Sequence, residues 1–256
     1  MSKFVVYDLP TRIFHWAFSV LFIAAFYIAK TIDDETVLFS YHMLAGLMLA
    51  GLVCLRILWG FIGTKYARFS SFYLNPKDLM IYIKGIFTGN KTKWIGHNPA
   101  SSWSTIIMLT SAAALAITGI LMTSGEKETY EDIHELLANI FLITMIVHIA
   151  GIIFHTIRHR DGIALAMVWG KKSHEEATYT DSITSLKTRT ALILVLFLVL
   201  FAGYLYKNFN PSTKELNLFY KVLILGDPVD MEESENERKD DSVSIENENG
   251  HMEENE

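Results

Sequence analysis

Residues 133–157, IHELLANIFLITMIVHIAGIIFHTI, are long and apolar enough to cross a bilayer as one helix. This stretch nevertheless contains three histidines, His134, His148 and His155. An ionisable side chain inside a membrane span is costly and by default marks a functional site that faces the interior of a helix bundle. Histidines in this setting predict partner residues on other spans of the chain.

Four further apolar stretches have the length of a membrane span. With the first they give five expected spans, at 13–29, 39–62, 103–122, 133–157 and 191–206. None of the five prolines falls inside a span, which suits uninterrupted helices. The first span lacks the small-residue cleavage site of a signal peptide, so we expect it to be retained. With 51% hydrophobic residues and a mean hydropathy of +0.26, the chain is predicted to be an all-α integral membrane protein.

Composition excludes several kinds of site. Cys54 is the single cysteine, which rules out an internal disulfide, a thiolate zinc cluster, an iron–sulfur centre and a Cys-x-x-Cys-His haem attachment. There is no glycine-rich phosphate loop, so nucleotide chemistry is not expected, and neither is a nucleic acid partner.

Charge is distributed unevenly along the chain. Residues 227–256 hold 13 acidic and 2 basic residues, and we expect them to form a disordered acidic tail. The loops at 63–102 and 158–190 carry six Lys or Arg residues each, whereas those at 31–38 and 123–132 are acidic. The excess of Lys and Arg in cytoplasmic loops places the N-terminus and both basic loops in the cytoplasm of a bacterial inner membrane. With five spans the tail is exterior; if the short last span did not insert, it would be cytoplasmic.

The depths of the histidines form two pairs. Because successive spans run in opposite directions, His42 should lie level with His134 near the exterior, and His15 level with His148 near the cytoplasm. Fourteen residues, or about 21 Å of helix, separate His134 from His148 on one face. Two imidazoles approaching from opposite sides suit a non-covalent six-coordinate b haem, whereas zinc needs further ligands at the same level. A structural histidine bonded to a neighbouring helix is the alternative at any one position, and His155 could replace His148, relay protons or face the headgroups.

Other residues fit the same picture. Gly46 and Gly151, near His42 and His148, would permit a flat macrocycle to approach the backbone, although small residues also serve ordinary helix packing in membranes. Arg56 should lie at the depth of the cytoplasmic haem, where it either pairs with a haem propionate or extends to the interface. His97 lies in a Gly-His-Asn-Pro turn; it has either a purely structural role or a role in binding quinone or moving its protons.

Several segments together resemble the bacterial cytochrome b561 family, in the branch of hydrogenase-type cytochrome b subunits. They are VYDLPTRIFHW at 6–16, HMLAG at 42–46, RILWGFIGTKYARF at 56–69, GHNP at 96–99, HELLAN at 134–139 and HIAG at 148–151. The resemblance implies a four-helix bundle that holds two b haems, with ligands at His15, His42, His134 and His148. We expect this domain at 1–175, a linker, the fifth span and a short following segment at 176–226, and the tail at 227–256.

The predicted function is that of a membrane-bound dihaem cytochrome b. It would carry electrons between the quinone pool and a periplasmic redox partner, such as a c-type cytochrome or a hydrogenase, while embedded in membrane lipid. One alternative is a stand-alone oxidoreductase that passes electrons from superoxide to quinone, which the acidic exterior loops disfavour because they repel an anion. Another is a non-redox anchor or transporter whose histidines relay protons.

Overall fold

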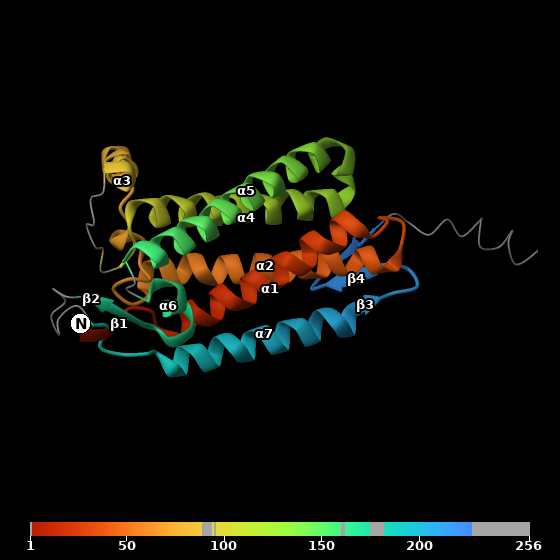
Figure 1. Ribbon diagram of the computed structural model, residues 1–256. Coiled ribbons are helices and arrows are strands. Elements are labelled where there is room, and N and C mark those ends of the chain that lie inside the picture. The colour runs from red at the N-terminus through yellow and green to blue at the C-terminus, as the bar shows by residue number, and fades with distance from the viewer. Residues whose placement is uncertain (1, 89–93, 95, 160–161, 175–181, 227–256) are drawn as a thin grey trace, which may run out of the picture.

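Five long helices run roughly along one axis (Figure 1). The computed structural model describes residues 2–88, 94, 96–159, 162–174 and 182–226, so the expected acidic tail at 227–256 lies outside the described residues. The long helices are α1 Leu9–Thr31, α2 Val37–Ile62, α4 Pro99–Leu121, α5 Lys127–His159 and α7 Thr188–Asn208. The shorter elements are β1 Ser2–Val5, the 3-10 helix η1 Phe69–Ser71, α3 Pro76–Thr88, the π-helical turn η2 Met122–Glu126, α6 Ile163–Trp169, β2 Lys171–His174, β3 Phe209–Asn210, β4 Glu215–Leu218 and β5 Lys221–Ile224.

Four helical segments of the described chain are long and apolar enough to cross a membrane, at 9–31, 37–62, 99–158 and 188–208. The third segment doubles back at Gly125, whose φ of 100° lies in the left-handed region that favours glycine. It thereby forms the two antiparallel helices α4 and α5, which pack along each other (Figure 1). The five apolar stretches of the sequence are thus helical in the structure, with α7 covering 191–206.

Helix starts follow from local sequence. Asp8 caps α1 by accepting a hydrogen bond from the Thr11 backbone amide at 2.8 Å, and Pro10 lies in the first turn. Asn98 caps α4 in a reciprocal pair with Ser101, and Pro99 begins the helix. The Asn-Pro of the expected turn therefore has a structural role as the start of α4.

The waist of the bundle is a small apolar core to which α1, α2, α4 and α5 each contribute one buried residue. These residues are Phe22, Val53, Ala112 and Phe141. The Phe22 and Phe141 rings lie 4.1 Å apart, centre to centre. The waist therefore divides the bundle interior into two halves, and α7 packs outside it along α1 and α2.

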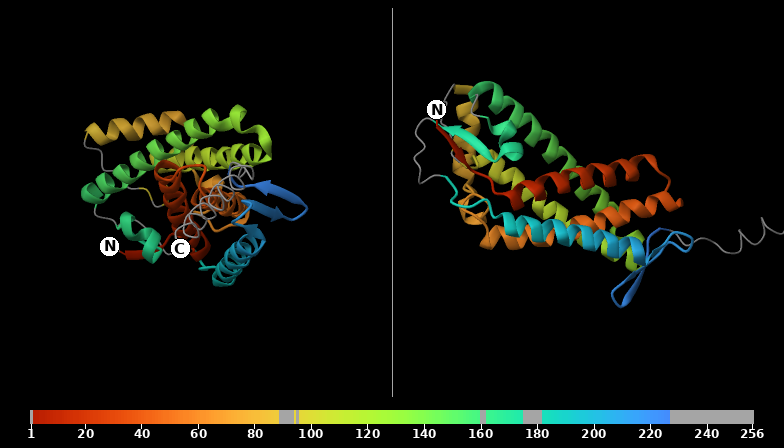
Figure 2. Two further views of the ribbon diagram at one scale, coloured as in Figure 1. Left: turned by 90° about the vertical axis from the view of Figure 1, so that its right-hand side faces the viewer. Right: turned by 90° about the horizontal axis from the view of Figure 1, so that it is seen from below.

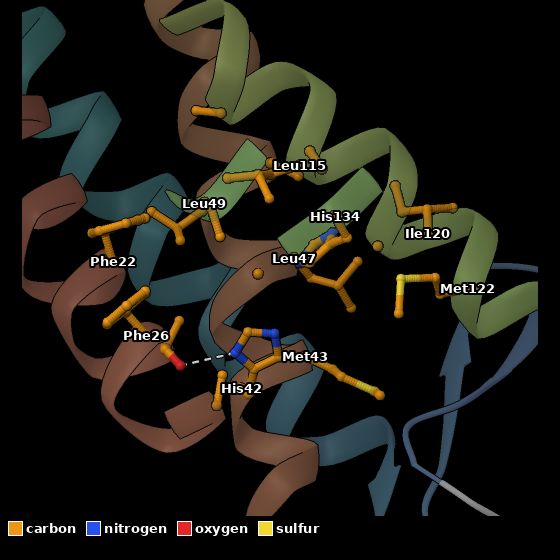
Figure 3. A pocket seen from close by; sticks show the side chains of 18 of the residues that line it. Phe22, Phe26, His42, Met43, Leu47, Leu49, Leu115, Ile120, Met122 and His134 are labelled. Atoms are coloured by element: carbon orange, nitrogen blue, oxygen red, sulfur yellow. Dashed lines mark hydrogen bonds between the residues drawn. The ribbon is translucent and has the colours of Figure 1, made fainter. Parts of the chain in front are cut away.

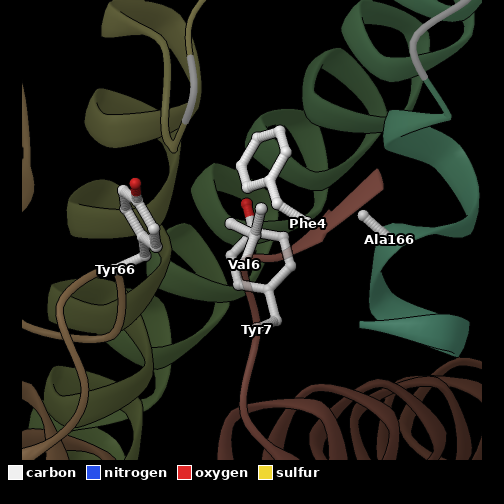
Figure 4. Packing of buried hydrophobic residues seen from close by; sticks show 5 residues of the cluster. All are labelled: Phe4, Val6, Tyr7, Tyr66 and Ala166. Atoms are coloured by element: carbon white, nitrogen blue, oxygen red, sulfur yellow. The ribbon is translucent and has the colours of Figure 1, made fainter. Parts of the chain in front are cut away.

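Each end of the bundle carries short strands that the sequence did not predict. At the N-terminal end, β1 and β2 pair antiparallel, and Phe4, Val6, Tyr7, Tyr66 and Ala166 form a buried cluster beside them (Figure 4). At the opposite end, hereafter the far end, β3, β4 and β5 form an antiparallel sheet near the α1–α2 turn (Figure 2). Helix α3 lies at the N-terminal end as well, with Met80, Ile81 and Phe87 exposed.

Candidate functional site

A cavity of about 310 Å³ lies between α1, α2, α4 and α5 in the far half of the bundle. His42 from α2 and His134 from α5 both line it (Figure 3). Their ring centres are 6.3 Å apart and their planes are inclined by 77°. The structure thus brings together the pair that helix depth alone predicted to be level.

Each imidazole in this cavity is oriented by a second hydrogen bond. His42 Nδ1 donates to the Ala25 carbonyl at 2.9 Å. His134 Nδ1 lies 2.8 Å from Thr118 Oγ1, and the Thr118 hydroxyl itself donates to the Ala114 carbonyl, so it accepts from the histidine. When Nδ1 is fixed in this way, Nε2 is left as a free electron-pair donor, which is how metal-binding histidines are usually held.

The cavity walls leave room for a flat group. Part of the cavity wall consists of residues with small or no side chains, namely Gly46, Ala50, Ala116 and Gly119. Phenylalanine and leucine side chains make up much of the remaining, apolar wall. No atom lies within 4 Å of a Cβ built on Gly46, whereas one built on Gly119 would lie 3.5 Å from His134 Cε1. Gly46 was expected beside a macrocycle, and Gly119 lines the same cavity.

The spacing of the histidines can be compared with what a metal between them requires. Two metal–imidazole bonds of about 2 Å, plus roughly 1 Å from each nitrogen to its ring centre, separate the centres of two opposed imidazoles by about 6 Å. The observed 6.3 Å agrees with that separation. Within the described residues, no three His, Cys, Asp or Glu side chains gather as a closed zinc site would need. The residues present therefore fit a bis-histidine haem.

His15 and His148 lie in the N-terminal half of the same bundle, one on α1 and one on α5. They are close enough to interact electrostatically, and each is half-buried. His155, seven residues further along α5, is buried, which does not fit a side chain facing the headgroups. A Cβ built on Gly151 would have open space around it.

Buried polar atoms without hydrogen-bond partners gather at the N-terminal end. In the described part of the chain they include Arg56 Nη1, His97 Nδ1, Trp94 Nε1 and Trp103 Nε1. Buried polar groups are normally paired, so such a concentration marks a place where a polar ligand fits. The sequence had singled out Arg56 and His97 as candidate functional residues. It did not predict the two indoles, because a tryptophan gives no sign in sequence of where its N–H points.

Arg56 is buried within the protein instead of extending to the interface. Its side chain is 6% exposed, and its guanidinium carbon lies 5.9 Å from the Phe14 ring centre and 5.4 Å from that of Phe69. A cation held between aromatic rings with an unsatisfied N–H retains a strong preference for an anion. That environment suits the carboxylate of a haem propionate.

His97 is also buried, packed 4.7 Å from the Phe72 ring and 5.8 Å from the Tyr7 ring. Burial, with the nearby positive charges of Arg56 and Lys172, lowers the pKa of His97 to about 3. The imidazole is therefore neutral at physiological pH. Its close neighbour Gly96 has no room for a side chain, because a Cβ there would lie 2.5 Å from the Tyr66 ring.

Comparison with known proteins identifies the family. The family model for prokaryotic cytochrome b561 matches residues 6–170, which include the three helices that carry these histidines and α4, the fourth helix that lines the cavity. The chain belongs to the prokaryotic cytochrome b561 family. As a member of it, this cytochrome b561 is a multi-pass membrane protein of electron transport, and the family cofactor is haem b.

Two relatives of this cytochrome b561 have names that describe a subunit. A probable Ni/Fe-hydrogenase B-type cytochrome subunit of Rhizobium leguminosarum bv. viciae is 27% identical, over 65% of this chain and 87% of the relative. A probable Ni/Fe-hydrogenase 1 B-type cytochrome subunit of Escherichia coli strain K12 is 24% identical, over 48% of this chain and 61% of the relative. No solved structure matches this cytochrome b561.

Proposed function

We propose that the protein is the membrane cytochrome subunit of a hydrogenase and that it binds two haem b groups without covalent attachment. His42 and His134 would hold one haem in the far half, and His15 and His148 would hold the other in the N-terminal half. The observation that carries the proposal is the opposed pair His42 and His134, 6.3 Å apart across an apolar cavity, with both Nδ1 atoms already bonded. Haem b, once bound, supplies an iron that alternates between ferric and ferrous states and so carries one electron.

The role of the chain is to hold the two haems in line across the membrane and to insulate the space between them. Phe18, Phe22 and Phe141 pack at the waist, with Phe141 4.1 Å from Phe22 and 5.6 Å from Phe18. His134 and His148 each lie seven residues from Phe141, about 10 Å along α5. Dry aromatic packing between two redox sites excludes water, and hydrophobic surroundings tune each potential.

At the N-terminal end we assign Arg56 to a propionate of the second haem and His97 to quinone. The unpaired buried Arg56 Nη1 supports the first assignment. A histidine whose pKa is about 3 does not take up a proton near neutrality, so His97 would hydrogen-bond a quinone oxygen without carrying its protons. Electrons would then pass between quinone at this end and a redox partner at the far end.

The proposed orientation puts the N-terminal end in the cytoplasm of a bacterial inner membrane and the far end in the periplasm. The names of the relatives from Rhizobium and Escherichia coli support a hydrogenase as the partner there. A periplasmic c-type cytochrome is the other candidate at the same site, since both would exchange single electrons with the far-end haem.

The decisive experiment is a reduced-minus-oxidised absorbance spectrum with haem counting. Purified protein should show a b-type spectrum and two haems per chain. His42→Ala or His134→Ala should each remove one haem, and His15→Ala or His148→Ala should remove the other. A protein without a b-type signal would end the proposal, and loss of a haem in His155→Ala but not in His148→Ala would reassign the ligand at the N-terminal end.

A further inference from the structure

A small antiparallel sheet lies over the far end of the bundle, in a part of the sequence that follows the residues matched by the family model. It consists of residues 209–226, the sheet β3–β4–β5 with Leu225 and Gly226, and we call it the C-terminal cap. The family match ends at residue 170, so the cap is outside the family's common part. Its buried face packs on α7 and on the first turns of α2 through one cluster. The buried members of that cluster are Leu205, Phe209, Leu216, Leu223 and Leu225.

The cap reaches the haem cavity directly. Leu225, which is fully buried, lines the cavity together with Met43 and Leu47, and both of these α2 residues also pack against the cap cluster. The Leu225 carbonyl accepts a hydrogen bond from the buried hydroxyl of Ser40, one turn before Met43. Leu225 therefore lines the cavity with its side chain and is hydrogen-bonded through its carbonyl to α2, the helix that carries His42.

The cap is fastened to both turns at the far end. The Lys214 side chain is buried, and its ammonium donates a hydrogen bond to the Glu35 carbonyl in the α1–α2 turn at 2.5 Å. The Lys214 carbonyl in turn accepts from the Leu225 amide at 2.8 Å, which ties the attachment to the cavity wall. On the other side β5 packs against η2, whose first residues, Met122 and Thr123, line the cavity. The cap thus bridges the α1–α2 and α4–α5 turns at the cavity mouth.

We propose that the C-terminal cap closes the far-end haem site against water and small dissolved oxidants, so that this haem exchanges electrons with a docked protein partner in preference to solutes. The inference rests on the proposed haem site at His42 and His134. An apolar wall at a haem edge limits solvent access and thereby influences the potential. It also lengthens the distance over which a small molecule in solution must collect an electron.

A pair of truncations tests the cap. A chain that ends after Asn208 lacks the cap, and a chain that ends after Gly226 keeps it and lacks only the residues that follow. Each purified protein is reduced and mixed rapidly with ferricyanide, and oxidation is followed by haem absorbance. Each reduced haem gives one electron to one ferricyanide, which becomes ferrocyanide, and no proton moves. We expect one haem to be oxidised several-fold faster after truncation at Asn208 and no change after truncation at Gly226.

Point variants repeat the test in a chain of full length. Leu225→Ala opens the cavity wall and Ser40→Ala removes the hydrogen bond to the Leu225 carbonyl, and both should speed oxidation of the same haem. The matched control is Tyr220→Ala, at the fully exposed tip of the β4–β5 turn of the same sheet. This variant should leave the rate of haem oxidation unchanged. If all these proteins retain both haems and are oxidised by ferricyanide at equal rates, the proposal that the cap shields the far-end haem is wrong. Absence of haem from the full-length protein would instead overturn the function on which the cap rests.

Discussion

Among single residues, Thr118 orients one of the two histidines of the far-end site, since its hydroxyl lies 2.8 Å from His134 Nδ1. The hydroxyl is placed one turn from the α4 backbone carbonyl to which it donates, so its acceptor lone pair points to His134 Nδ1. A threonine that bonds to its own helix is common in membrane helices and gives no signal in sequence. The sequence could single out the histidines because an ionisable side chain inside a span is costly. It could not single out Thr118 or the Ala25 carbonyl, because their bonds to the histidines depend on helix rotation.

Thr118→Val keeps the shape of the side chain and removes the acceptor. We expect far-end haem affinity to fall roughly 10- to 100-fold, the usual cost of losing such a supporting bond. The measurement is haem content per chain after extended washing in detergent. Thr110→Val is the control, because Thr110 donates to its own helix in the same way but is exposed. An equal loss of haem in both variants would show that the bond to His134 is not the cause.

Arg56→Leu should leave both haems bound and lower the potential of the haem at the N-terminal end. In a medium of effective dielectric constant about 20, a buried unit charge roughly 10 Å from a redox centre favours its reduced form by about 1–2 kcal/mol, on the order of 50 mV, and Arg56 would act in this sense on a haem bound at this end. A spectroscopic redox titration measures the change. Arg56→Lys, which keeps the charge, should recover most of it, and a titration curve identical to that of the unaltered protein would contradict the assignment.

At the scale of elements, hydropathy predicted every long helix because a membrane span needs about 20 apolar residues and leaves a strong signal. It did not predict the cap, which was expected only as a short segment after the last span. The strands β3, β4 and β5 contain two to four residues each, too few for alternation to be read. The turn between β4 and β5 is Phe219-Tyr220, with φ of 53° at Phe219, and lacks the Asn-Gly pattern of a two-residue hairpin.

The close packing of α4 on α5 makes Gly119 a sensitive point of the far-end site. A Cβ alone would sit at ordinary contact distance from His134, so Gly119→Ala should retain both haems. Gly119→Leu would push the imidazole aside, and we expect it to lose the far-end haem and keep the other. The absorbance spectrum measures this directly. Gly203→Leu on α7, where a Cβ has open space, should behave like the unaltered protein, and retention of both haems by Gly119→Leu would contradict the site.

At the scale of the whole molecule, charge separates the two ends. In the described residues the N-terminal end carries Arg and Lys on α3, β2 and the neighbouring loops, with Asp8 and Asp78 as its acids. The far end carries the acidic turn 33–35 and the acidic first half of α5. The loop charges that predicted the orientation from the sequence thus lie at opposite ends of the fold, as a positive-inside arrangement requires.

Labelling of single cysteines by a membrane-impermeant maleimide tests the orientation. In a Cys54→Ser background, Asp33→Cys should be labelled in intact spheroplasts and Lys77→Cys only in inverted vesicles, since both native side chains are exposed at opposite ends. The reverse pattern would invert the proposed topology and place the cap in the cytoplasm.

The fold-back at Gly125 makes the haem-binding part of the chain two helical hairpins, α1 with α2 and α4 with α5. Each proposed ligand pair takes one histidine from each hairpin: His42 and His15 from the first, His134 and His148 from the second. If these pairs hold haem, neither hairpin completes a site alone, and each haem would bind only where both hairpins have met. Haem binding at these two levels would add its free energy to the packing between the two hairpins. The apolar waist already packs the two hairpins together, so haem would strengthen that contact and the stability of the bundle would depend on haem supply.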